Sequence, residues 1–222
     1  MPTLAINTIS GGLSFALARG GHVVAHEHHA ITRGHDAQLL PLLGLFLQNN
    51  HTHYNQLARV VALRGPGSFT GIRLGLATVL GLSVALNIPA LGLNRLHLYH
   101  TMPLDVPEGA RRVVVLQSRR DELFCHPADD TMHLLTLPQI MHTYGGNPWH
   151  LVTDDAALHS AITQNGGRAT CAGSAETAAS AAYASTLGEE AFARHPATPL
   201  YGRAPDVSCG PAFANPIVNA RA

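Results

Sequence analysis

Residues 65–73 read GPGSFTGIR and join a short apolar segment to a long uncharged one. Glycine-rich loops before helices can hold a phosphate, because their backbone amides approach the anion closely. A Walker loop, however, needs the spacing GxxxxGK[ST], and this chain contains no lysine. Pro66-Gly67 is instead typical of a turn, and Ser68 or Thr70 can cap the helix that follows. We therefore interpret the loop as the start of a helix and assign it no catalytic role.

The helix predicted after the loop, over about residues 70–86, is rich in small residues. They fall in two sets with a spacing of four, so that each set follows one stripe of the helix: Gly71 with Gly75, and Ala77 with Gly81 and Ala85. Each glycine costs a helix about 1 kcal/mol relative to alanine, a cost that is tolerated where another backbone comes close. That backbone can belong to the protein's own sheet or to a second protein.

Residues 74–94 carry no charge and reach the length of a membrane span. Thr78 and Ser83 interrupt the apolar run, and Asn87-Ile88-Pro89 should end the helix. A second predicted helix, over residues 36–48, is apolar nearly all round and must be covered on more than one side. We therefore expect two buried or interface helices and no contact with a membrane.

The pattern of apolar runs and turns predicts two similar halves. The first half has strands at 3–8, 13–18 and 22–28, a helix at 36–48, a strand at 60–63, a helix at 70–86 and a strand at 89–93. The second has strands at 111–117, 122–126 and 132–135, a helix at 138–144, a strand at 150–152, a helix at 154–164, a strand at 168–172 and a helix at 174–187. This order predicts mixed sheets flanked by helices. We expect lobes at 1–105 and 106–206, with a tail at 207–222 that lacks a pattern.

Charge and cysteine content limit the function. The 14 arginines balance 14 acidic residues without a basic run, so the composition does not indicate direct binding of nucleic acid. The three cysteines, Cys125, Cys171 and Cys209, lie far apart and form no CxxC pair, which is typical of reduced thiols in the cytosol. The N-terminus lacks the pattern of a signal peptide. We expect a cytoplasmic protein.

The chain holds 15 histidines, but their spacing does not indicate a metal site. His22, His26 and His28 would share one face of a strand. Four more lie close in sequence: His29, His35, His51 and His53. No HExxH pair is present, and no GxSxG elbow marks a nucleophile. Residues 119–122, RRDE, can form a solvated turn or a charged cluster in a cleft. We assign neither a catalytic residue nor a metal ligand.

Six further segments occur in order between Leu4 and about Asp206: LAINTIS, RGHDAQLLPLLGLFL, VVALRGPGSFTGIRLGLATVLGLSVALNIPALGL, SRRDELF, LVTDDA and PLYGRAPD. The series resembles the TsaB family of the bacterial machinery for threonylcarbamoyladenosine in tRNA. GPGSFTGIR with its glycine-punctuated helix is the most specific segment. The resemblance implies a two-lobed, actin-like ATPase fold of the ribonuclease H-like α/β class, with a degenerate second lobe.

The resemblance also implies a role without catalysis. TsaB proteins are dimerisation partners of TsaD, which transfers threonylcarbamoyl to adenosine 37 of tRNA; the ATPase TsaE joins the complex, and homodimers also form. This chain would then meet tRNA only through the complex and need no cofactor, because the complex rather than this chain would hold any nucleotide. The family pairs through its two N-terminal helices. The residues implied here are Leu39, Leu43, Phe46, Gly71, Gly75, Ala77, Thr78, Gly81 and Leu82.

The sequence departs from the family in a degenerate cleft, whose implied residues are Asn7, Gly67, Ser68 and Arg119. Asn7 stands where the family has the aspartate of AIDTS, and residues 117–119 read QSR in place of DAR. The two lost acids disfavour one enzymatic alternative, a stand-alone nucleotide-binding kinase of the actin-like class. The other alternative is a glycoprotease-like metallopeptidase. Its HxxxH spacing is matched by His22 and His26, which lie on a predicted strand rather than on a helix.

Overall fold

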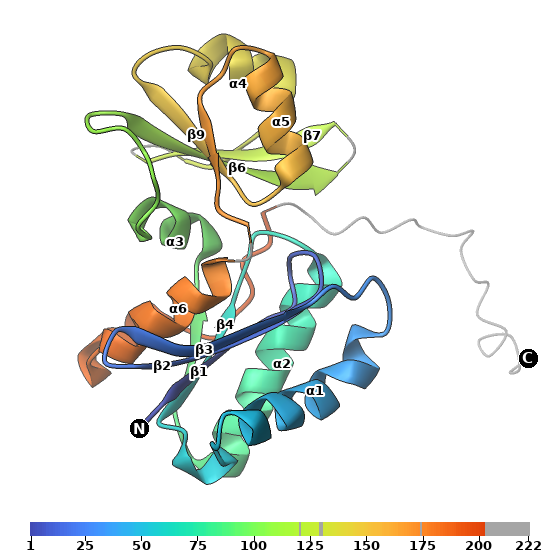
Figure 1. Ribbon diagram of the computed structural model, residues 1–222, viewed down its shortest axis with the longest axis vertical. Helices are drawn as coiled ribbons and strands as arrows, with labels where there is room; N and C mark the ends of the chain where they lie inside the picture. The colour runs from blue at the N-terminus through green and yellow to red at the C-terminus, as the bar shows by residue number, and fades with distance from the viewer. Residues whose placement is uncertain (120, 129–130, 174, 203–222) are drawn as a thin grey trace, which may run out of the picture.

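The computed structural model describes residues 1–119, 121–128, 131–173 and 175–202, and Figure 1 shows two lobes, each built on one sheet. The first half contains β1 (Thr3–Asn7), β2 (Leu13–Arg19), β3 (His22–His29), α1 (His35–Asn49), the short turn η1 (Tyr54–Gln56), β4 (Arg59–Leu63), α2 (Phe69–Leu86), β5 (Ala90–Leu93) and α3 (Arg95–Thr101). The strand order of its sheet is β3-β2-β1-β4-β5. β2 is antiparallel to both neighbours, whereas β1, β4 and β5 are parallel.

The second half repeats this arrangement. It contains β6 (Arg111–Arg119), β7 (Glu122–Pro127), β8 (His133–Thr136), α4 (Leu137–Tyr144), β9 (Trp149–Thr153), α5 (Ala156–Gln164), β10 (Ala169–Cys171), α6 (Ala175–Thr186) and the turn η2 (Glu189–Arg194). Its strand order, β10-β9-β6-β7-β8, is the same order read from the other edge. Both halves run β-β-β-α-β-α-β-α, the duplicated α/β topology of actin-like ATPases, so the expected fold class is confirmed.

The predicted elements all occur, with bounds shifted by at most two residues. The structure also contains a helix that the sequence does not predict, α3. Its seven residues follow β5 after Asn94 alone, and the side chain of Asn94 caps the helix by accepting a hydrogen bond from the Leu96 amide at 2.9 Å. Two turns of helix are too short for a 3.6-residue period to show in the sequence.

Two helices cross between the halves. α6 packs against β1, β2 and β3 of the first sheet, opposite α1 and α2, although its residues follow the whole second sheet in the chain (Figure 1). α3 packs in return against β6 of the second sheet. The prediction that residues 174–187 belong to the second lobe is therefore wrong for this helix. Ala181 and Ala184 are fully buried in the first core, because their small side chains let α6 lie close on the strands.

The first sheet is thus covered on both faces, and its central strands are buried and mostly apolar. All five residues of β1 are buried, as are the last four residues of β4. β3 forms the sheet edge, and its exposed side chains include three histidines and the two valines Val23 and Val24. The predicted tail at 207–222 lies outside the described residues.

Candidate functional site

A cleft of about 730 Å³ opens between the two halves. Its walls come from the loops after β1, β4 and β9 and from the end of β6, so that both halves contribute. Of the predicted cleft residues, Gly67, Ser68 and Arg119 line this space. Asn7 lies beneath it and is only 3% exposed.

A buried polar cluster centred on Arg95 supports the floor of the cleft. The Arg95 Nε donates to the Glu176 Oε2 at 2.7 Å, and its Nη2 forms an ion pair with Asp154. The Tyr99 hydroxyl donates to the same Glu176 oxygen at 2.7 Å, and the Asn7 Nδ2 donates to the Glu176 Oε1 at 2.8 Å. We call these five residues the Arg95 cluster. It joins α3, α6, β1 and the end of β9, and so ties the two halves together.

The two carboxylates of the cluster differ in their electrostatics. Burial acts to raise the pKa of Glu176, but Arg95 and the hydrogen bonds from Ser10 and Tyr99 outweigh it, so this pKa lies below its ordinary value. Burial raises the pKa of Asp154, and Arg95 offsets this effect only in part. Glu176 is therefore a fixed buried anion, whereas Asp154 is an ionisable group at the cleft wall.

The acids that line the described part of the cleft already have structural roles. Asp154 is held by Arg95, and Asp155 accepts a hydrogen bond from the Leu158 amide at 2.8 Å as the cap of α5. A phosphate-transferring site needs acids that are free to hold a metal ion beside the phosphates. Asp154 and Asp155 are thus both engaged by other groups of the protein.

Sequence reasoning missed Arg95, Asp154 and Glu176. Glu176 is the one charged residue of the alanine-rich α6, and such an isolated charge is a signal of burial with a partner. The partner could not be found, because Arg95 is 81 positions away and lies on the helix that the sequence did not reveal.

Asn7 has a direct structural explanation. Its Nδ2 group donates to Glu176 and, at 3.2 Å, to Thr177, while its Oδ1 accepts from the Ile9 amide at 2.9 Å. An aspartate at this position would replace the donor by a second negative charge next to Glu176. The amide is therefore the residue that fits beside this carboxylate.

The loop at residues 65–73 starts α2, as predicted. The Ser68 side chain accepts a hydrogen bond from the Gly71 amide at 3.2 Å, so Ser68 is the cap. Gly71 and Gly75 both lie against Thr8 at the end of β1: a Cβ at Gly75 would come within 2.7 Å of the Thr8 Oγ1, and a Cβ at Gly71 would collide with the Thr8 carbonyl. The close backbone is thus the protein's own sheet.

This finding corrects part of the predicted partner surface. Leu39, Leu43 and Phe46 are at most 1% exposed and lie in the first core, and Gly71 and Gly75 are buried against β1. None of these five can meet a partner while the chain is folded. Ala77 and Gly81 are exposed, and Thr78 and Leu82 are half-buried. Both helices are apolar nearly all round, so their sequences do not distinguish the inward stripe from the outward one.

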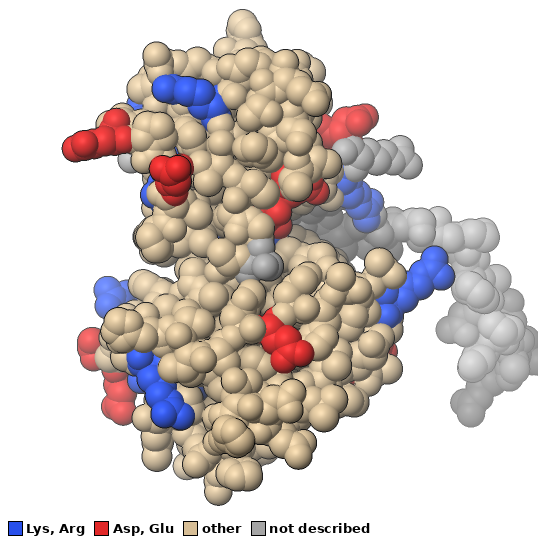
Figure 2. Space-filling model, in the orientation of Figure 1, with Lys and Arg blue, Asp and Glu red and all other residues tan. Residues whose placement is uncertain are grey.

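The outward stripes of α1 and α2 expose four large apolar side chains: Leu40 at 57%, Leu45 at 53%, Leu80 at 45% and Val84 at 85%. We call these four residues the α1–α2 face. Both helices lie on the side of the first sheet opposite α6 (Figure 1), and the surface at the lower end of the molecule in Figure 2 is almost free of charge. Within the described residues, α2 is the one helix long and apolar enough to cross a membrane, with a mean hydropathy of 1.7 and 28% of that window buried.

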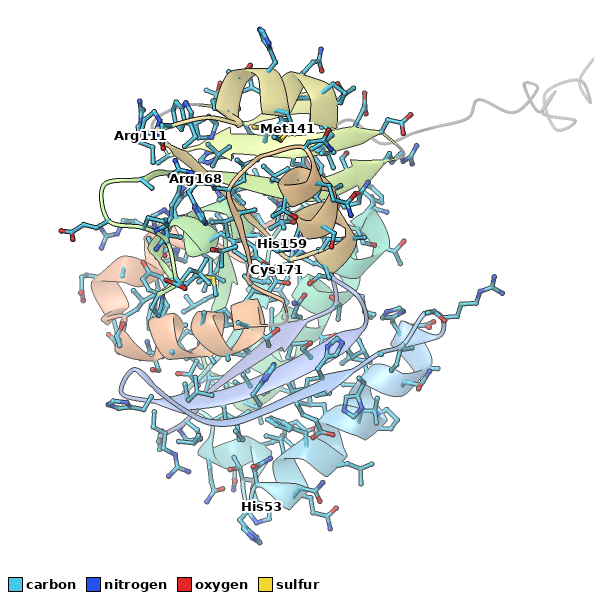
Figure 3. The ribbon with its side chains drawn as sticks, turned by 45° about the horizontal axis from the view of Figure 1, so that its top comes forward. His53, Arg111, Met141, His159, Arg168 and Cys171 are labelled. Atoms are coloured by element: carbon cyan, nitrogen blue, oxygen red, sulfur yellow. The ribbon has the colours of Figure 1, made fainter. Side chains whose placement is uncertain are left out.

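The histidine and cysteine side chains that could bind a metal ion do not lie close together. His22, His26 and His28 are exposed on β3, and His53 lies at the far end of the first half, away from His159 and Cys171 (Figure 3). Within the ranges that the structure describes, no three His, Cys, Asp or Glu residues are placed to hold a metal ion. Cys125 is buried and Cys171 exposed, whereas Cys209 lies outside the described residues.

Comparison with known proteins gives the family. The family model for TsaD, described as tRNA N6-adenosine threonylcarbamoyltransferase, matches residues 22–136, from β3 to β8. The chain belongs to the TsaD family. The match includes both helices of the α1–α2 face and the GPGSFTGIR loop, but it ends before Asp154 and Glu176.

Within the TsaD family, the chain is similar to TsaB proteins, named for tRNA threonylcarbamoyladenosine biosynthesis. It is 27% identical to that of Haemophilus influenzae over 54% of this chain and 51% of the relative. It is 34% identical to that of Escherichia coli over 43% of this chain and 41% of the relative. The chain thus matches about half the length of these curated relatives, or less.

One solved structure has a similar fold over a longer part of the chain than the sequence matches cover. It is that of an uncharacterized Pseudomonas aeruginosa protein with similarity to peptidase YeaZ, and it is 22% identical to this chain. The match covers 91% of this chain and 99% of the other, with a TM-score of 0.67. The two-lobed architecture is therefore shared over nearly the whole chain.

Proposed function

We propose that this chain is a non-catalytic subunit of the machinery that forms threonylcarbamoyladenosine in tRNA, and that it pairs with a TsaD-type transferase. It acts in the cytoplasm and meets tRNA through the complex. The ATPase TsaE joins the complex, and any nucleotide is held there rather than by this chain alone. A homodimer through the same surface is the state expected when the transferase is absent.

The α1–α2 face is the observation that carries the proposal. Soluble proteins seldom expose several large apolar side chains on one side of the molecule, since each gains about 1.5–3 kcal/mol on full burial. Leu40 and Leu45 lie on one helix, and Leu80 and Val84 on its neighbour, inside the segment matched by the TsaD family. Exposed Gly81 and Ala77 lie beside them and would let a partner helix approach closely.

The Arg95 cluster supports the absence of catalysis. Its carboxylates are bound to Arg95, and Asn7 provides a hydrogen-bond donor where metal-dependent chemistry would need an acid. A metal-dependent peptidase or a kinase would instead need these carboxylates to be free to hold a metal ion.

The pairing is tested with the double variant Leu80→Asp/Val84→Asp. Because these residues have no role in the core, we expect the melting temperature to stay unchanged while association with the TsaD-type transferase of the same organism weakens about thirtyfold or more. Size-exclusion chromatography and calorimetric titration measure the association. Formation of threonylcarbamoyladenosine is followed with the complex and with this chain alone, which we expect to be inactive.

The control variant is Leu134→Asp, which places the same charge at an apolar side chain that is 39% exposed on the second half. We expect it to leave the association unchanged. Equal weakening by both changes, or full binding by the double variant, would contradict the proposed surface. Turnover by this chain alone would contradict the non-catalytic role.

A further inference from the structure

A second pocket, of about 300 Å³, lies beside α3 and shares no lining residue with the cleft. β4, β5, α3, α6 and η2 all reach it. Its cationic or ionisable residues are Arg64, His97, Arg194 and His195, and its neutral polar ones are Asn94, Thr101 and Tyr183. None of the described residues that line it is acidic. We call it the arginine pocket.

The two arginines of the pocket lack compensating partners. Among the described residues, no hydrogen bond or ion pair engages the guanidinium of Arg64 or Arg194, and the Arg64 Nε is buried without a partner. Glu189 and Glu190 are exposed at the other end of η2. Arg194 is exposed and Arg64 is half-buried, with its Nε fully covered. A buried donor without an acceptor is costly, so an anion next to Arg64 would be stabilised there.

The pocket is also held in shape. The Arg64 amide donates to the Leu93 carbonyl at 2.9 Å, and the Arg64 carbonyl accepts from the Leu200 amide at 2.7 Å. The His195 ring packs edge-on against Tyr183, with 5.8 Å between the ring centroids. Since the Asn94 Oδ1 already accepts from Leu96, its amide group is left as a donor. A fixed backbone reduces the entropy lost when a ligand binds.

We propose that the arginine pocket binds a phosphate group, presented either by a small phosphorylated molecule or by a nucleic-acid backbone. Arginine suits this ligand because its planar donors match two phosphate oxygens at once. The volume is at the lower limit of small-molecule sites and fits a phosphate with a small attached group. The site is independent of the proposed pairing, because the α1–α2 face contributes none of its residues.

The His195 ring gives the site a pH signature. Its pKa is lowered by burial and by the nearby His97, Arg194 and Arg64, so the ring is largely neutral in the empty pocket at neutral pH. A bound anion reverses the sign of the local field and favours the protonated ring. Since ligand and proton then stabilise each other, affinity should rise as the pH falls.

The test uses the full chain and four probes: inorganic phosphate, AMP and bulk tRNA, with sulfate added to measure the dependence on pH. We expect Arg64→Gln/Arg194→Gln to weaken binding at least tenfold for every probe that binds the unaltered protein. Its melting temperature should not fall, since neither guanidinium has a partner in the described structure, and removal of the unpaired Arg64 Nε should if anything raise it. Arg33→Gln removes one exposed positive charge elsewhere and should have little effect. Should the double variant fail to fold, His195→Gln serves as the second test.

The probes separate the two sources of phosphate. Binding of phosphate and AMP assigns the site to a small molecule, and binding of tRNA alone assigns it to a nucleic-acid backbone. Sulfate, whose charge stays constant between about pH 8 and pH 5, should bind more tightly at the lower pH, and His195→Gln should reduce this dependence. The proposal is overturned if no probe binds, if binding survives the double variant, or if Arg33→Gln weakens it equally.

Discussion

At the scale of single residues, the molecule shows how a buried charge determines its neighbours. Glu176 is fully buried, and Arg95, Tyr99 and Asn7 each direct a donor at it. A carboxylate so placed is stable only with its donors present, because desolvation alone would neutralise it. The loss of the expected acid at position 7 is thus part of the same arrangement.

Glu176 should make the free energy of unfolding depend on pH in a defined direction, and its replacement by glutamine should remove this dependence. A carboxylate whose folded pKa is depressed stabilises the fold above its unfolded pKa, and this contribution is lost as the pH falls through the folded value. We expect Glu176→Gln to cost about 3–5 kcal/mol at neutral pH, because Arg95 loses its buried partner. The difference from the unaltered protein should narrow below about pH 4, where glutamate carboxyl groups of the unfolded chain become protonated. Urea unfolding of both proteins, at neutral pH and below about pH 4, measures this difference in the free energy of unfolding.

Glu108→Gln is the matched control, since Glu108 is exposed in the segment before β6. Its unfolding free energy should follow that of the unaltered protein at both pH values. A cost of Glu176→Gln that stays constant with pH would show that shape, not charge, accounts for the effect.

At the scale of elements, the sequence predicts whether a segment is a helix or a strand, but not which side of a helix faces the core. The sequence predicts the helix over about residues 70–86 from its loop, with Ser68 or Thr70 as the cap, and the structure has it at Phe69–Leu86 with Ser68 as the cap. The sequence does not predict which side of this helix faces the core. The buried Ile72, Leu76 and Val79 are no more apolar than the exposed Leu80 and Val84. Only the fold, by placing Thr8 against Gly71 and Gly75, distinguishes them.

Two glycines of α2 provide a test of this orientation. A Cβ at Gly75 would come within 2.7 Å of the Thr8 Oγ1, whereas a Cβ at Gly81 would meet nothing within 4 Å. We expect Gly75→Ala to destabilise the chain by about 1–3 kcal/mol through overpacking. Gly81→Ala should stabilise it by up to about 1 kcal/mol, because alanine favours the helix. Thermal unfolding of the two variants should move in opposite directions, and equal shifts would refute the assigned stripes.

At the scale of the whole molecule, the duplication was predictable and the exchange of helices was not. Apolar runs and turns repeat in the same order in each half, so the order of elements could be read locally. The contacts of α6 with the first sheet and of α3 with the second join segments far apart in the chain. No local pattern carries that information, and for the same reason the Arg95 cluster was not foreseen.

Removal of α6, which follows the second sheet in the chain, should therefore unfold the first half, against whose sheet it packs. We expect a chain that ends at residue 173 to lose the first core, since β1 and β2 would be exposed on one face. Fluorescence of a dye that binds exposed apolar surface should rise, and the cooperative thermal transition should disappear. The control Ser160→Ala lies on the exposed side of α5, and it should keep both signals at their original values.

The position of α6 also has a consequence during synthesis. A ribosome releases the strands of the first sheet long before it releases residues 175–186, which cover one face of that sheet. The nascent first half must therefore wait, with an apolar face uncovered, until the second half has been made. Completion of the first half therefore depends on residues 175–186, which are made after all the strands of the second sheet. A chaperone that shields apolar strands would find its substrate in that interval.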